Sequence, residues 1–82
     1  MNNHITTVHT RCPYAPVWDY YTVIVETPDF LRCEKLQAVC EEIRGKEITQ
    51  EQVYQHIKSK IYAAKVIVKG RHGQNGRLVI AG

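Results

Sequence analysis

The segment that decides the fold is YYTVIVET, at residues 20–27. Aromatic and β-branched side chains dominate it, as is typical of a β-strand. Successive side chains of a strand point to opposite faces, so Tyr21, Val23 and Val25 form one apolar face while the other face is mixed. We therefore expect a strand over these eight residues, with its apolar face against a core.

Three more strands are expected, one before this segment and two after it. The β-branched stretch at residues 5–10 predicts a first strand. A loop is expected at 11–16, because the two prolines there remove backbone donors. Near the C-terminus, strands are expected at 65–69 and 78–81, and the Asn-Gly pair at 75–76 is typical of a hairpin turn between them.

Two helices are expected between the pairs of strands. Apolar residues recur at helical spacing over residues 34–43, with a basic residue and a glycine following at the predicted end. The second helix has a capping box, Thr49 with Gln52, and Ile48 and Val53 can form a hydrophobic staple around it. The predicted order is ββααββ, and 82 residues leave room for one core, so residues 1–82 form a single α+β domain.

Composition narrows the class of protein. With 44% apolar and 23% charged residues, the chain matches a soluble globular domain. No apolar run approaches the roughly 20 residues needed to span a bilayer, and the N-terminus has no secretory signal pattern. The three cysteines are an odd number without CxxC spacing, which favours a reducing, cytoplasmic location over a disulfide scaffold.

Charge is distributed unevenly along the chain. Residues 1–51 hold all eight carboxylates and five of the eleven Lys and Arg residues, whereas residues 52–82 hold the other six and no carboxylate. A basic half without carboxylates suggests a polyanionic partner, with RNA as the first candidate, although a solvated basic face is an equal alternative. The candidate nucleic-acid contacts are Lys58, Lys69, Arg71 and Arg77.

Two blocks of sequence carry a resemblance to a known family. Cys12-Pro13 follows the first predicted strand, and Asp19 lies seven residues beyond the cysteine, directly before the second strand. Further on, Arg44-Gly45-Lys46-Glu47-Ile48 precedes the second helix. With these motifs the chain resembles the 7-cyano-7-deazaguanine reductases and their QueF-like relatives over roughly residues 5–82.

The resemblance implies a fold and an assembly. It implies a tunnelling fold, in which an antiparallel sheet carries two helices on one face. Several such sheets close into a ring, and the homo-oligomer binds purine-like bases at subunit interfaces.

The resemblance also implies an activity. The reductases carry a signature on the first helix that is linked to NADPH use, and residues 32–39 here lack its leading Glu and both of its lysines. What remains is similar to the amidinotransferase branch, which adds ammonia to the nitrile of 7-cyano-7-deazaguanine in tRNA and gives archaeosine. That activity needs ammonia as co-substrate and no cofactor. The alternatives are an NADPH-dependent reductase of the queuosine pathway and a non-catalytic module that binds a base or RNA.

Residue roles follow from the same resemblance. Cys12 would be the nucleophile that adds to the nitrile and forms a thioimide, and Asp19 would be the proton donor. Glu51 would accept hydrogen bonds from the base, Gln50 stands where the family has His, and Trp18 could stack on the base.

Each of these residues also has a purely structural interpretation. Cys12 could be a small buried apolar residue, Asp19 could cap a turn, and Glu51 suits the first turn of a helix. Cys33 and Cys40 are expected to be packing residues. The His and Cys residues lack the short paired spacing of a zinc site, so we expect no metal.

Overall fold

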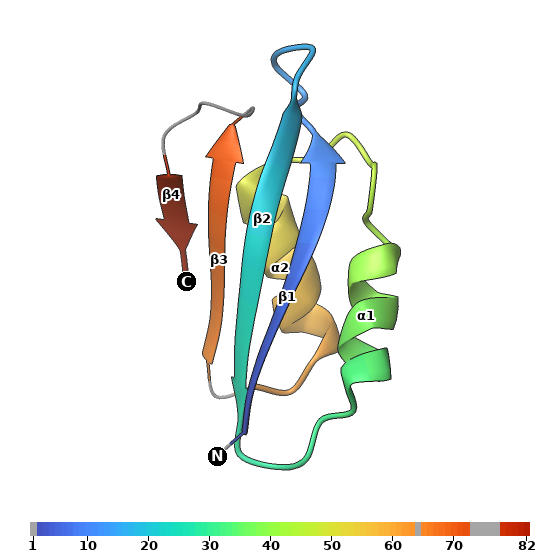
Figure 1. Cartoon of the computed structure of the whole chain (residues 1–82), viewed down its shortest axis with the longest axis vertical. Coiled ribbons are helices and arrows are strands. Elements are labelled where there is room, and N and C mark those ends of the chain that lie inside the picture. The colour runs from blue at the N-terminus through green and yellow to red at the C-terminus, as the bar shows by residue number, and fades with distance from the viewer. Residues whose placement is uncertain (1, 64, 73–77) are drawn as a thin grey trace.

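The computed structural model describes residues 2–63, 65–72 and 78–82. Its strands are β1 (Asn2–Arg11), β2 (Trp18–Thr27), β3 (Lys65–His72) and β4 (Leu78–Ala81), and its helices are α1 (Cys33–Glu41) and α2 (Gln50–Lys60). The strands form one antiparallel sheet in the order β1-β2-β3-β4 (Figure 1). The predicted α+β class and ββααββ order are confirmed.

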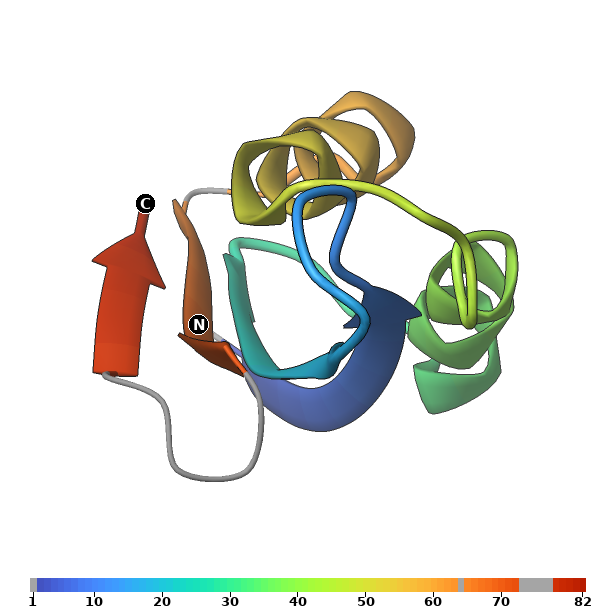
Figure 2. The ribbon, with the colours of Figure 1, turned by 90° about the horizontal axis from the view of Figure 1, so that it is seen from above.

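Both helices cover the same face of the sheet, which curls around them (Figure 2). Tyr21, Val23 and Val25 of β2 are buried on this inner face, as their alternation predicted. Val66 and Val68 of β3 join them, and α2 packs against β3 while α1 packs against β1. The opposite, outer face of the sheet has no helix over it in the described part of the chain.

The start of α2 is as predicted, and this matters for the site. Thr49 is the N-cap, its side chain accepts from the Gln52 N–H at 3.2 Å, and Gln52 Oε1 accepts from the Thr49 N–H at 2.8 Å. Two backbone donors of the first turn are therefore satisfied. The cap fixes the first helical residue, Gln50, at the top of the sheet.

Several predicted boundaries were wrong. Helix α1 ends at Glu41 rather than Ile43, so Arg44 lies in the turn after the helix and not in its last turn. Gly45 adopts φ +77° there, a conformation that glycine tolerates, and its N–H donates to the His9 carbonyl at 2.9 Å. The segment after α1 is thereby attached to β1.

The strands are longer than their local sequence indicated. β1 begins at Asn2 and ends at Arg11, and β3 continues to His72 although the sequence predicted a turn from Gly70. The reason is pairing, since β2 supplies partners from Asp19↔His72 to Glu26↔Lys65. The predicted Asn-Gly turn at 75–76 and Arg77 lie outside the described residues.

Candidate functional site

The Cys12 loop connects β1 to β2 at the top of the sheet. The Cys12 N–H donates to the Val17 carbonyl at 3.0 Å, which closes the loop and turns the side chain inward. Cys12 is only 6% exposed. The Tyr14 N–H donates to Cys12 Sγ at 3.3 Å, so a backbone donor faces the sulfur and would stay hydrogen-bonded as the sulfur gains negative charge.

Asp19 lies at the start of β2, on the inner face, and is 5% exposed. The Tyr21 hydroxyl donates to Asp19 Oδ2 at 3.4 Å. Burial, and then the negative charge of Asp19, raise the pKa of Tyr21 to about 12, so the phenol stays protonated and remains a donor. Thr10 is fully buried and is the cross-strand neighbour of Asp19. The apolar core thus ends here in a group of buried polar side chains.

Gln50 ties the start of α2 to the sheet. Its Nε2 donates to the Val68 carbonyl at 3.0 Å and to the Val79 carbonyl at 2.8 Å, which joins the helix to β3 and β4 together. Both partners are acceptors, so the amide nitrogen must face them, and the Oε1 acceptor takes no part in these two bonds.

These residues share one hollow of about 180 Å³. Cys12, Asp19, Tyr21, Gln50 and Arg71 all line it. Gly70 also lines the hollow, and a Cβ at this position would overlap the ring of Tyr21. The hollow is smaller than the roughly 300–1,000 Å³ of typical small-molecule sites. It suits one ring system, or a site that another chain completes.

The structure places the remaining predicted residues elsewhere. Glu51 is exposed on the first turn of α2, where it lines a neighbouring open hollow with Pro13 and Tyr14 rather than the hollow of Cys12. Trp18 lies on the outer face of the sheet, with its ring 5.2 Å from the His9 ring, and therefore does not face Cys12.

The predicted basic contacts do not form one surface. Lys69 and Arg71 lie on the outer side of β3. Lys58 lies on α2 in the helix layer, with its Nζ 5.9 Å from the centre of the Tyr54 ring. Arg77 lies outside the described residues.

The other two cysteines differ from each other. Cys40 is buried on the core side of α1, and burial raises the pKa of its thiol, as suits a packing residue. Cys33 is exposed at the first position of α1, so its expected packing role is wrong. Among the described residues, no group of three or more His, Cys, Asp or Glu side chains could hold a metal ion.

One member of the site, Tyr21, was missed in the sequence. Tyr21 was assigned to the core because it shares the parity of Val23 and Val25, yet its hydroxyl ends beside Asp19. A signal was available, because a residue two positions from Asp19 in a strand faces the same side. The link from Gln50 to two strands had no sequence signal, since it depends on how the helix docks.

Comparisons with family models, with curated proteins and with solved structures find no match to this chain. Neither described helix is long and apolar enough to cross a membrane.

Proposed function

We propose that the chain is a QueF-like amidinotransferase that acts on 7-cyano-7-deazaguanine in tRNA. The observation that carries the proposal is the shared hollow of Cys12 and Asp19, which lie in different elements and are both almost fully buried. The carboxyl group of Asp19 accepts from the Tyr21 hydroxyl and lines the same cavity as the Cys12 thiol, so a proton carrier and a nucleophile face one space. The resemblance supplies the reaction class.

The chemistry balances with the groups present. The Cys12 sulfur adds to the nitrile carbon, and the thiol proton reaches the nitrile nitrogen through Asp19, which gives a thioimide. Ammonia then adds to the same carbon, the carbon–sulfur bond breaks, and the thiol is restored while the base keeps an amidine. No electron is gained or lost, so this route needs no nicotinamide.

Base binding would use the acceptors that surround the hollow. Gln50 Oε1 is one, because its amide nitrogen is already committed to two carbonyls. Glu51 would be the second, and it lies one residue further along α2, beside the Cys12 loop. Acceptors suit the ring N–H and exocyclic amine of a guanine-like base.

We also propose a tunnelling fold that assembles into a ring in the cytoplasm. The small hollow and the exposed position of Glu51 support a site at a subunit interface, where a second copy would cover Glu51 and enlarge the cavity.

The test uses tRNA that contains the nitrile base. With ammonium present, the isolated nucleoside should gain the mass of ammonia. Cys12→Ser should abolish this product, whereas Cys33→Ser, the matched control at an exposed cysteine, should retain it.

A product that forms only with NADPH, and carries an aminomethyl group, would instead establish the reductase alternative. If neither product forms and the base binds tightly, the chain is a non-catalytic module.

A further inference from the structure

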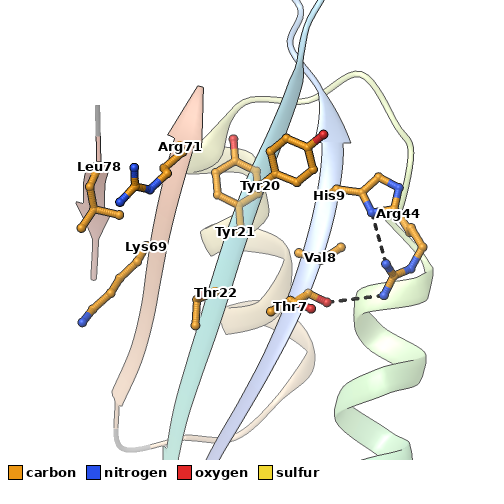
Figure 3. A pocket seen from close by; sticks show the side chains of 10 residues that line it. All are labelled: Thr7, Val8, His9, Tyr20, Tyr21, Thr22, Arg44, Lys69, Arg71 and Leu78. Carbon is orange, nitrogen blue, oxygen red and sulfur yellow. Dashed lines mark hydrogen bonds between the residues drawn. The ribbon is translucent and has the colours of Figure 1, made fainter. Parts of the chain in front are cut away.

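The outer face of the sheet carries a second hollow of about 390 Å³, larger than that of Cys12. Figure 3 shows its lining, which comes from β1, β2, β3, β4 and the turn after α1. Pairing places His9, Tyr20, Arg71 and Leu78 in one row across the four strands. Two residues further along the strands, Thr22 and Lys69 are paired on the same face.

Of the ten described residues that line this hollow, six are basic or aromatic and none is acidic; the six are His9, Tyr20, Tyr21, Arg44, Lys69 and Arg71. Tyr20 is 47% exposed although it sits in the middle of a sheet. The centre of its ring lies 6.5 Å from that of the His9 ring, and the centre of the Trp18 ring lies 5.2 Å from that of the same His9 ring. Three rings therefore follow one another along the exposed surface of β1 and β2.

Positive charge accompanies these rings. Arg11 lies 5.6 Å from the centre of the Trp18 ring. Arg44 is held by Glu41 at 2.8 Å and by the Thr7 carbonyl at 3.4 Å, so its charge is partly matched. Within the described part of the chain, no carboxylate lies within ion-pair distance of Lys69 or Arg71. Their charge is available to a partner.

We propose that this outer hollow binds a single-stranded segment of nucleic acid. Bases would stack on Tyr20 and its neighbouring rings, while Lys69 and Arg71 would contact phosphates. Aromatic platforms beside cations are how proteins bind single strands with little sequence preference. Three cations and no acidic residue line the hollow among the described residues, so charge complementarity favours a polyanion, and the exposed rings favour one that carries flat bases.

The inference rests on the proposed function in one respect, namely that the substrate base belongs to a polynucleotide. Arg71 lines both hollows, so the two sites approach each other at β3. The strand on the outer face would then be the flanking segment, and the reactive base would lie in the hollow of Cys12. Tyr20 and Lys69 line only the outer hollow, whereas Cys12 lines only the inner one, so the two sites can be disabled separately.

The test is fluorescence anisotropy with a labelled single-stranded RNA of about twelve nucleotides, within the usual site size of such surfaces. Tyr20→Thr should weaken binding about tenfold or more, because one stacked base is lost. Lys69→Gln should lower the slope of log affinity against log salt by about 0.7, the value for one phosphate contact on a single strand. Lys60→Gln removes the same charge from the exposed end of α2 and should leave the slope unchanged.

Three results would overturn the inference. The first is that the RNA does not bind. The second is that heparin competes as well as unlabelled RNA and Tyr20→Thr has no effect, which would mean general attraction of polyanions. The third is that Tyr20→Thr changes the oligomeric state and leaves the RNA affinity unchanged, which would mean that this face is a contact between copies of the chain. Adduct formation between Cys12 and the free nitrile base separates the two proposals. If Tyr20→Thr loses RNA but keeps the adduct, both stand; if RNA binds and no adduct forms, the docking face stands without the chemistry.

Discussion

Replacing Gly70 by alanine should damage both the stability of the domain and the geometry of the site. The added Cβ would lie closer than 3.0 Å to Cδ1 and Cε1 of Tyr21 and 3.5 Å from Cδ of Gln50. Carbon atoms in contact sit about 3.5–4.0 Å apart. The Tyr21 ring must therefore move, yet it is 4% exposed and packed in the core.

Overpacking of this kind costs about 1–3 kcal/mol, and the severity of the overlap points to the upper half of that range. With a urea dependence near 1 kcal/mol per molar, as for the smallest domains, the unfolding midpoint should fall by about 2 M. The displaced phenol should become less buried and should also leave Asp19, so the raised pKa of Tyr21 should move back toward 10.

Gly45→Ala is the matched control. Gly45 adopts φ +77° and a Cβ there would meet no atom within 4 Å, so the cost is the backbone term alone, about 1–2 kcal/mol. It should not change the titration of Tyr21. A loss below about 0.5 kcal/mol for Gly70→Ala, or an unchanged Tyr21 titration in that variant, would refute the packing of Tyr21 on Gly70.

Three further predictions concern the same part of the molecule. Thr49→Ala removes the N-cap acceptor of α2 and should lower the free energy of unfolding by about 1 kcal/mol, as measured by urea denaturation; Thr49→Ser should keep most of it. Tyr21 holds its proton more tightly in the folded state, so its contribution to stability is present below pH 10 and is lost as pH rises toward 12. Stability curves of the native chain and Tyr21→Phe should therefore converge over that window, and parallel curves would contradict the assignment. Gln50→Glu places a carboxylate against the Val68 and Val79 carbonyls and should destabilise the domain by about 1–3 kcal/mol at neutral pH; a smaller loss at acidic pH, where the carboxyl can donate, would follow from the same contacts.

The order of elements could be predicted because each carried a local signal. The alternation in residues 20–27 marked the buried face of β2, and the Thr49–Gln52 pair marked the first residue of α2. The ends of β1 and β3 could not be predicted, because pairing with β2 and not local sequence extends them. The same holds for the end of α1, which stops where the following turn attaches to β1.

The candidate site could be predicted in part. The resemblance to the QueF-like family singled out Cys12 and Asp19, and the structure brings these two residues to one hollow. Trp18 was expected near Cys12 because the two residues are close in sequence. The structure begins β2 at Trp18, so Trp18 and its neighbour Asp19 face opposite sides of the sheet. The basic residues were grouped by sign of charge, whereas the sheet separates Lys58 from Lys69 and Arg71.

The most direct test of the central claim is the intact mass of the protein after incubation with 7-cyano-7-deazaguanine without ammonia. We predict an adduct equal to the mass of the base, present in Cys33→Ser and absent in Cys12→Ala. A chain that stays unmodified both with saturating free base and with the base supplied inside tRNA, or an adduct that persists in Cys12→Ala, would contradict the assignment of Cys12 as the nucleophile.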